Sequence, residues 1–294
     1  MPRSNIIFFT QIMAEIKFHS FSVIIPALNE EFYIDKCLES LKNQDYKGDF
    51  EILVVNNGST DNTAFIAQKY GVRILDEPQR GISRALRKGC ELGKGEIFAF
   101  TDADTIVSSG WLSKINQDFC SDQNVVAAGG PFTFYDAPSE IDFIFNKLIS
   151  PFSTLAFRIF IFSISPALPN ANMAIRSDIY KMVGGFNSKM NWGQEIEICK
   201  RIRNYGKIIF DSKLKVETSF RRCSLGSNNW IFIFLNTFRL LILGISRHLG
   251  IYFKNRFYPA QEPIRLLPKN ILGKARQKTY LVRKVIASVF ASLF

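Results

Sequence analysis

The stretch Glu96–Thr105, EIFAFTDADT, is the most informative part of the sequence, because an apolar run of strand length ends there in two carboxylates, Asp102 and Asp104. A short continuous apolar run of this kind is typical of a strand that is buried on both faces. We therefore predict a strand over Glu96–Thr101, with both carboxylates at its carboxyl end. Two Asp side chains one residue apart supply the oxygen ligands that Mg²⁺ or Mn²⁺ takes while leaving positions open for substrate phosphates.

Outward from this stretch, apolar runs alternate with helical patterns. The strands are predicted at Phe21–Pro26, Glu51–Asn56, Val72–Leu75 and near Val125–Gly130, and the helices at Glu30–Asn43, up to Tyr70, and at Ile82–Leu92. Such alternation predicts βαβ units and a Rossmann-like, mostly parallel α/β sheet flanked by helices. Ligands of these sheets bind beyond the carboxyl ends of the strands. The polar pairs Asn29-Glu30, Asn56-Asn57 and Asp102/Asp104 all fall at such ends.

Seven motifs between about Phe21 and Phe210 resemble, in their order, the family 2 glycosyltransferases of the GT-A fold. They are VIIPALNEE (Val23–Glu31), VVNNGSTDNT (Val54–Thr63), RGISRALRKG (Arg80–Gly89), FTDADT (Phe100–Thr105), NANMAIR (Asn170–Arg176), VGGFN (Val183–Asn187) and GQEIEICKRIRNYG (Gly193–Gly206). The resemblance implies a GT-A catalytic domain over residues 21–220. It also implies a nucleotide-sugar donor, a divalent metal ion and inversion of the anomeric configuration.

The resemblance also implies roles for residues of the donor side. Asp104 would bind the metal ion, Mg²⁺ or Mn²⁺, and Asp102 would contact the ribose or the metal shell. The residues placed around the nucleotide-sugar are Pro26, Ala27, Asn29, Glu30, Asn57, Arg80 and Asp102. The family often has an acidic residue where Asn56-Asn57 stands. Because an amide both donates and accepts hydrogen bonds, the identity of the nucleotide base stays open.

On the acceptor side, the family's base segment reads Glu-Asp, whereas this chain has Gln194-Glu195. Glu195 therefore takes the place of the general base that accepts the proton of the acceptor hydroxyl. Glu is one methylene longer than Asp, so Glu197 is kept as the alternative base. Asn172 and Trp192 are also assigned to the acceptor side. Trp192 is a candidate stacking platform for an acceptor sugar, and a core Trp is the alternative.

The charge is unevenly distributed along the 294 residues, whose net charge is +11. Residues 221–294 hold 13 Lys and Arg against one acid, while the other 220 residues hold 24 bases and 25 acids. The basic residues of the tail are interleaved with apolar runs, which favours an anionic membrane surface over nucleic acid as the partner. Five scattered cysteines without a CxxC pattern fit a reducing cytosol.

Three apolar segments motivate the prediction of membrane association. Residues 141–168 are Phe-rich, and Trp230–Ile245 is shorter than a bilayer-spanning helix. The last segment repeats apolar pairs every four residues up to Phe294, which predicts a basic amphipathic helix. Packing of that helix on the catalytic domain or on a second copy is the alternative. We therefore expect a short extension (1–20), a catalytic domain (21–220) and a membrane-associating region (221–294), peripheral or monotopic on the cytoplasmic face of the membrane.

These expectations describe a transferase that moves a sugar to a hydroxyl of a lipid-linked or cell-surface glycan, and several alternatives stay open. A polyprenyl-phosphate sugar synthase ranks lower because Thr105-Ile106-Val107 follows where a Leu-Gln-His-like run is usual. A processive synthase lacks the expected QxxRW-like sequence. A catalytically silent paralogue that binds a nucleotide-sugar remains an alternative, because Asn56-Asn57 and Gln194-Glu195 depart from the family pattern.

Overall fold

The computed structural model describes residues 17–138, 168–190 and 193–222. These residues belong to the first of two compact units, Met1–Tyr252, and the second unit, Phe253–Phe294, lies outside the described residues. The three segments predicted to associate with a membrane, apart from Leu168, also lie outside them. Within the described parts of the chain, no helix is long and apolar enough to cross a bilayer.

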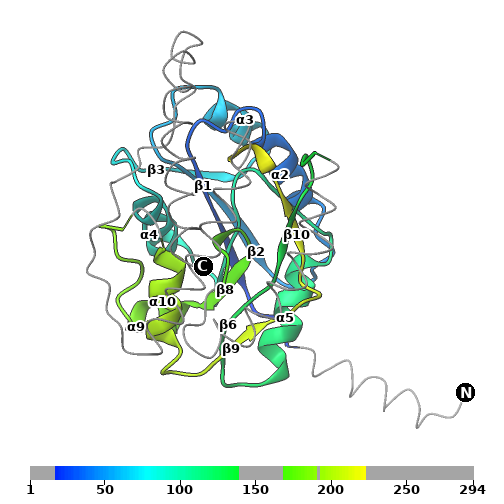
Figure 1. The fold of residues 1–294 in the computed structure, drawn as a ribbon, viewed down its shortest axis with the longest axis vertical. Coiled ribbons are helices and arrows are strands. Elements are labelled where there is room, and N and C mark those ends of the chain that lie inside the picture. Colours follow the sequence, from blue (N-terminus) through cyan, green and yellow to red (C-terminus); the bar gives the residue numbers. More distant parts are fainter. Residues whose placement is uncertain (1–16, 139–167, 191–192, 223–294) are drawn as a thin grey trace, which may run out of the picture. The chain divides into compact units, whose positions relative to one another are not determined.

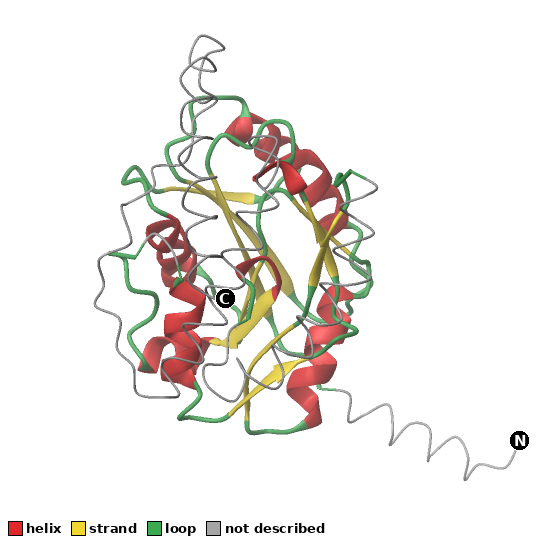
Figure 2. Cartoon of the chain, in the orientation of Figure 1, coloured by secondary structure: helices red, strands yellow, loops and turns green. Residues whose placement is uncertain are grey.

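A seven-stranded sheet forms the centre of the fold (Figures 1 and 2). Its strand order is β3-β2-β1-β4-β8-β6-β9. In that order the strands are β3 (Arg73–Asp76), β2 (Phe50–Asn56), β1 (Phe21–Ala27), β4 (Ile97–Phe100), β8 (Met173–Arg176), β6 (Val125–Gly129) and β9 (Lys207–Phe210). All neighbouring pairs are parallel except those of β8, which runs antiparallel to both β4 and β6. The prediction of a mostly parallel sheet is therefore confirmed.

A second, three-stranded sheet of order β5-β10-β7 was not predicted. It consists of β5 (Thr105–Val107), β10 (Val216–Thr218) and β7 (Phe132–Phe134), with β10 antiparallel to β5 and parallel to β7. Strand β5 begins immediately after Asp104, so this small sheet starts at the two carboxylates. The chain leaves β10 into the short 3-10 helix η4 (Phe220–Arg222), and the predicted boundary between catalytic domain and tail falls inside η4.

Helices cover both faces of the large sheet, as Figures 1 and 2 show. One face packs against α2 (Ile34–Lys42), α3 (Thr63–Lys69) and α5 (Trp111–Ser121), and the other against α4 (Ile82–Leu92), α9 (Ser177–Met182) and α10 (Gln194–Ile202). Neighbouring residues of a strand point to opposite faces. Strand β1 therefore contributes to both cores, which accounts for its continuous apolar sequence.

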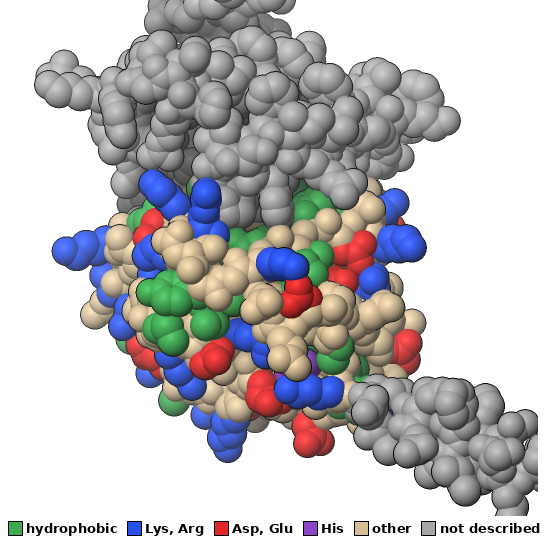
Figure 3. Space-filling model, turned by 90° about the horizontal axis from the view of Figure 1, so that it is seen from below, with side chains coloured by type: hydrophobic (Ala, Val, Ile, Leu, Met, Phe, Trp, Pro, Cys, Tyr) green, Lys and Arg blue, Asp and Glu red, His purple; other side chains and the backbone are tan. Residues whose placement is uncertain are grey.

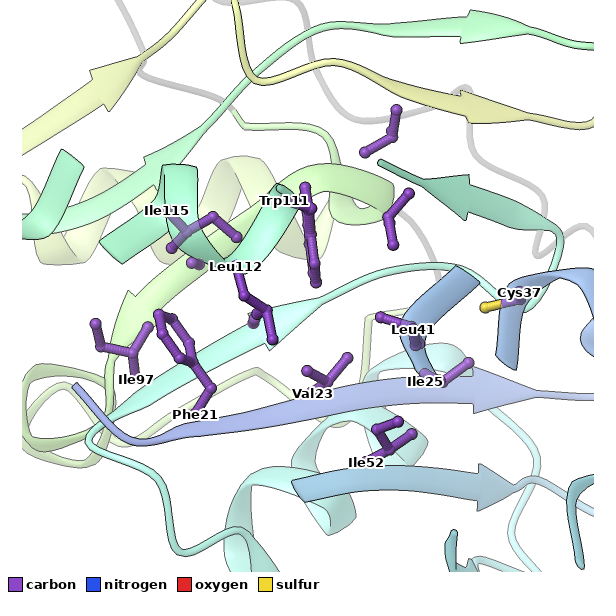
Figure 4. Close-up of a cluster of buried hydrophobic side chains, with 14 of the residues drawn as sticks. Phe21, Val23, Ile25, Cys37, Leu41, Ile52, Ile97, Trp111, Leu112 and Ile115 are labelled. Atoms are coloured by element: carbon purple, nitrogen blue, oxygen red, sulfur yellow. The ribbon is translucent and has the colours of Figure 1, made fainter. Parts of the chain in front are cut away.

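The core beneath α2 and α5 is shown in Figure 4. Val23 and Ile25 of β1 lie between the side chains of both helices, and Trp111 and Leu41 are fully buried there. Burial of each large apolar side chain stabilises the fold by about 1.5–3 kcal/mol. This packing fixes the ends of β1 and β4, from which the polar loops of the candidate site extend.

The surface of the described body mixes both signs of charge. In the view of Figure 3, Lys and Arg side chains alternate with Asp and Glu among uncharged residues. This agrees with the near-balanced charge of residues 1–220 in the sequence.

Candidate active site

The loops that follow β1 and β2 are held together by hydrogen bonds between their polar side chains and backbones. Asn29, whose φ of 58° is left-handed, accepts a hydrogen bond from the backbone N–H of Thr60 at its Oδ1, at 2.8 Å. The backbone N–H of Glu30 donates to Oγ1 of Thr63 at 2.7 Å. Asn and Asp tolerate left-handed φ better than most residues. Asn29 and Glu30 therefore lie at the carboxyl edge of the sheet, as predicted, in a loop of fixed shape.

Two other residues predicted for the nucleotide side lie at the end of β1. Ala27 is buried, and its carbonyl accepts the backbone N–H of Asn57 at 2.8 Å. Pro26 is partly buried in the strand. The loop that contains Asn29 begins directly after these two residues.

Asn57, predicted on the nucleotide side, forms hydrogen bonds with backbone groups at both ends of its side-chain amide. Its side-chain amide donates to the carbonyls of Glu77 and Gln79, both at 2.9 Å, and its Oδ1 accepts the backbone N–H of Gly81 at 2.8 Å. A buried amide engaged at both ends does not offer its groups to a ligand. Asn57 thus fixes the loop that carries Arg80, whose exposed guanidinium lies near the carbonyl of Gly58 at 3.4 Å.

The two carboxylates that follow β4 lie in different surroundings. Asp102 is partly buried, and its Oδ1 accepts a hydrogen bond from Nδ2 of Asn170 at 2.9 Å. Asp104 is only 3% exposed, and so is nearly fully buried together with Glu30 of the β1 loop. Burial raises the pKa of the Cys37 thiol, and the charges of Asp104, Asp102 and Glu30 raise it further.

Arg221, which the sequence analysis counted with the basic tail, lies in this site. Its Nε and Nη2 donate to Oδ2 of Asp104 at 3.0 and 2.8 Å, and Nη2 also forms an ion pair with Glu30. The guanidinium stacks on Tyr33, with 4.1 Å between its Cζ and the ring centroid. No local sequence pattern indicates this contact, because β10 is only three residues long and Arg221 is 117 residues away from Asp104.

Glu195 lies in the first turn of α10, and this helix begins directly after Gly193. Gly193 has a φ of 75°, a left-handed conformation that suits glycine, and it turns the chain into the helix. Burial raises the pKa of Glu195, and the negative charge of Asp102 raises it further. The structure thus brings together the candidate base and the first Asp of the FTDADT motif, although 93 residues separate them in the sequence.

Glu197, the alternative base, is engaged in a structural contact. Its two carboxylate oxygens accept hydrogen bonds from Nε and Nη2 of Arg201 at 2.7 and 2.6 Å. The same guanidinium donates to the carbonyls of Val183 and Gly185. Glu197 thus orients Arg201, which in turn ties α10 to the turn after α9.

Asn172, which the sequence assigns to the acceptor side, has its side chain in the core. Asn172 is fully buried; its Oδ1 accepts the indole N–H of Trp111 at 2.9 Å, and its Nδ2 donates to the carbonyls of Pro131 and Leu214. The amide therefore joins α5 to two distant loops of the core. Trp192, the other residue assigned to the acceptor side, lies outside the described residues.

Three oxygens beside the carboxylates accept no hydrogen bond within the described parts of the chain: Oγ1 of Thr101, Oδ1 of Asn170 and Oε1 of Gln194. Thr101 and Gln194 are buried, and they are the sequence neighbours of Asp102 and Glu195. Buried polar atoms normally find a partner. These oxygens are therefore candidate contacts for hydroxyl groups of a ligand, which the sequence analysis missed.

The donor set suits a hard divalent cation. The described residues contain no cluster of three or more His, Cys, Asp or Glu side chains arranged around a common metal position. Two carboxylates at a strand end, Asp102 and Asp104, match the one or two protein ligands of Mg²⁺ sites in which substrate phosphates complete the shell. A cation there would be held jointly by protein and substrate.

Comparisons with known proteins agree with this geometry. A sequence model described as "Glycosyl transferase family 2" matches residues 22–183, more than half of the chain. The glycosyltransferase AglE of Haloferax volcanii is 29% identical over 194 residues. The match covers 63% of this chain and 62% of AglE, so the chain spans less than two thirds of the length of that relative.

Two solved structures share the fold. The mannosyltransferase PcManGT from Pyrobaculum calidifontis, in complex with GDP-Man and Mn²⁺, has a TM-score of 0.59 at 17% identity over 85% of this chain and 72% of its own. S. aureus TarS 1-349 in complex with UDP-GlcNAc has a TM-score of 0.55 at 20% identity over 77% of this chain and 66% of its own. At these identities the likeness establishes the fold alone.

Proposed function

Because the chain belongs to glycosyl transferase family 2, we propose that it is a metal-dependent, inverting glycosyltransferase with Glu195 as its general base. The donor is a nucleotide-sugar, and the acceptor is a hydroxyl of a lipid-linked or cell-surface glycan. The observation that carries the proposal is that Glu195, at the start of α10, is buried within the electrostatic range of Asp102, so that burial and this carboxylate raise its pKa.

The donor binds at the carboxyl edge of β1, β2 and β4. Three loops surround the nucleotide: the loops of Asn29 and Thr60, which are hydrogen-bonded to each other, and the loop of Arg80. Asn57 holds the Arg80 loop in place. Asp104 and Asp102 would hold Mg²⁺ or Mn²⁺, whose charge would offset that of the nucleoside diphosphate. Arg80 adds a positive charge on the same side.

Glu195 takes the proton from the acceptor hydroxyl as the hydroxyl oxygen attacks the anomeric carbon. The new carbon–oxygen bond forms on one face while the bond to the diphosphate oxygen breaks on the other, so the anomeric configuration inverts. The raised pKa of Glu195 makes its carboxylate a stronger base than an ordinary surface Glu. The unpartnered oxygens of Thr101, Asn170 and Gln194 support recognition of sugar hydroxyls beside it.

The nucleotide base and the sugar are open to test. The structural neighbours were solved with GDP-Man and with UDP-GlcNAc, which supports a guanosine or uridine donor here. Because both ends of the Asn57 amide are engaged by backbone groups, we assign base recognition to the backbone and to the loop of Arg80.

We assign the acceptor to the cytoplasmic face of a membrane. The support comes from the sequence: the Phe-rich stretch at 141–168 and the basic, apolar region 221–294 match the composition of segments that bind anionic membrane surfaces. Sedimentation of the full-length chain with anionic vesicles, compared with neutral vesicles, tests this assignment. A chain that stays in the supernatant with both would contradict it.

The function is tested by release of nucleoside diphosphate from UDP-, GDP- and dTDP-sugars with Mn²⁺ or Mg²⁺ and an added membrane lipid extract. Metal-dependent release from one donor, lost in Asp104→Asn and retained in Arg73→Gln, is the expected result. Arg73 pairs with Glu51 at the opposite end of the sheet, so it is a matched control for a charge change. Binding of a donor without release under every condition would favour a catalytically silent paralogue instead.

A further inference from the structure

The guanidinium of Arg221 binds Asp104, the carboxylate that the proposed function assigns to the metal ion. Both of its contacts with Asp104 fall on Oδ2, at 3.0 and 2.8 Å, and it also pairs with Glu30. Asp104 and Glu30 are 3% and 4% exposed, so the guanidinium contacts two buried carboxylates.

A divalent cation and this guanidinium exclude each other at Asp104. Mg²⁺ binds carboxylate oxygens at about 2.0–2.1 Å. A guanidinium held at hydrogen-bond distance from the same oxygen would place a third positive charge beside the ion, in a buried site where screening is weak. Binding of the cation therefore requires Arg221 to leave Oδ2 of Asp104.

The backbone next to Arg221 is held by hydrogen bonds that do not involve the guanidinium. The backbone N–H of Ser219 donates to the carbonyl of Asp104 at 3.2 Å, and Asp136 accepts hydrogen bonds from Ser219 Oγ and from the N–H of Phe220. The guanidinium lies over the Tyr33 ring, a contact that keeps a cation close without fixing its direction. Its side chain is 25% exposed, so the protein does not fully enclose it.

We propose that Arg221 binds the donor diphosphate, and that it moves there from Asp104 when the divalent cation binds. The inference rests on the proposed function, because that function brings the cation and the diphosphate to the same place. Arg presents a planar fork of donors that matches phosphate oxygens. Without the Arg221 guanidinium, the cation would not have to displace a positive charge from Asp104, and the diphosphate would lose a hydrogen-bond donor. Arg221 thus weakens binding of the cation alone and strengthens binding of the nucleotide.

The first measurement is the affinity of Mn²⁺ for the nucleotide-free protein, obtained by electron paramagnetic resonance of free Mn²⁺. It compares wild type with Arg221→Gln, Arg221→Lys, Asp104→Asn and the control Arg73→Gln. Arg221→Gln should bind Mn²⁺ more tightly, on the order of tenfold, because two charge-assisted hydrogen bonds no longer compete for Oδ2 of Asp104. Arg221→Lys should fall between, since a point charge replaces the fork.

The second measurement is the affinity for GDP and UDP at saturating Mn²⁺, by calorimetry on the same proteins. Arg221→Gln should bind the preferred nucleoside diphosphate on the order of tenfold more weakly, the loss expected for one charge-assisted contact to phosphate. Arg73→Gln should match wild type in both measurements. The opposite signs of the two effects distinguish this role from simple damage to the site.

Thermal unfolding adds a readout that does not depend on activity. Arg221→Gln leaves two buried carboxylates without this cation, so its Tm should fall in metal-free buffer and should rise with MnCl₂ by more than that of wild type. If Arg221→Gln does not fold, the same comparison is made with Arg221→Lys.

The outcomes separate the two claims. If Mn²⁺ and nucleotide bind to wild type and are lost in Asp104→Asn, while both Arg221 variants match wild type, the inference is overturned and the proposed function stands. Weakening of both affinities in Arg221→Gln, or tighter Mn²⁺ with unchanged nucleotide, also overturns it. If wild type binds neither Mn²⁺ nor nucleotide, the proposed function fails and the inference fails with it.

Discussion

Arg201 holds Glu197 by two hydrogen bonds, of 2.6 and 2.7 Å, and donates two more to the carbonyls of Val183 and Gly185. Glu197 is therefore a structural partner, although it lies two residues from the candidate base. Gly185 has a φ of 69°, so the turn that Arg201 binds is a conformation that few other residues adopt.

We predict that Glu197→Gln lowers stability while leaving the chemistry intact. Loss of the charge weakens a partly exposed i,i+4 pair, which costs about 1 kcal/mol. Urea unfolding should show this loss, and kcat at a temperature where the variant is folded should stay within about threefold of wild type, since no proton-transfer group has changed. A loss of kcat as large as that of Glu195→Gln would return Glu197 to the role of base.

Asn172→Ala should destabilise the protein by about 2–3 kcal/mol, because the Trp111 N–H and the carbonyls of Pro131 and Leu214 would lose a buried partner. Chemical denaturation measures the effect. Asn43→Ala, at an exposed position, is the matched control and should change stability little. An unchanged stability together with a raised KM for the acceptor would restore the acceptor role that the sequence suggested.

Asn57→Ala should raise KM for the donor on the order of tenfold, with a smaller effect on kcat, because the loop of Arg80 loses three anchoring hydrogen bonds. The comparison between UDP- and GDP-sugars is decisive. If Asn57 positions the loop, both donors are weakened by a similar factor and the preference between them persists. A reversal of the preference would mean that the Asn57 amide reads the base.

The pH dependence of the reaction should reflect the raised pKa of Glu195. As pH falls, kcat/KM should decline with a midpoint above the ordinary Glu value of about 4.3, because burial and Asp102 favour the protonated base. For the same reason the Glu195 charge destabilises the fold at neutral pH. Glu195→Gln should therefore be at least as stable as wild type at pH 7, and this advantage should disappear at pH values below the ordinary Glu pKa.

The strands of the parallel part of the sheet were predictable because each is a continuous apolar run. Strands β1, β2, β3, β4 and β6 lie within a residue or two of their predicted bounds. Strand β8 was missed because MAIR, Met173–Arg176, has only four residues and its antiparallel pairing with β4 and β6 depends on distant partners. A local pattern carries no information on such pairing.

The position of a site residue was predictable where its motif lies at the end of a strand. The partners of a side chain were less predictable where they come from distant parts of the sequence. Asp104 and Glu195 could be picked from their motifs. The partners of Asn57 and Asn172 depend on how loops far apart in sequence meet, and an amide side chain looks the same whether it binds a ligand or a carbonyl. The place of Arg221 in the site could not be predicted from the basic composition of residues 221–294, because a count of charges does not distinguish a solvated Arg from one paired with Asp104.

The most direct test of the account compares donor binding and transfer in Glu195→Gln, with Glu197→Gln as the matched control. Calorimetry with the nucleoside diphosphate and Mn²⁺ should give affinities within about twofold of wild type for both variants, since neither residue is assigned to the donor. Turnover should fall about 10²–10⁴-fold in Glu195→Gln alone, the usual cost of losing a general base. Turnover of Glu195→Gln within about tenfold of wild type would contradict the assignment of Glu195 as the base.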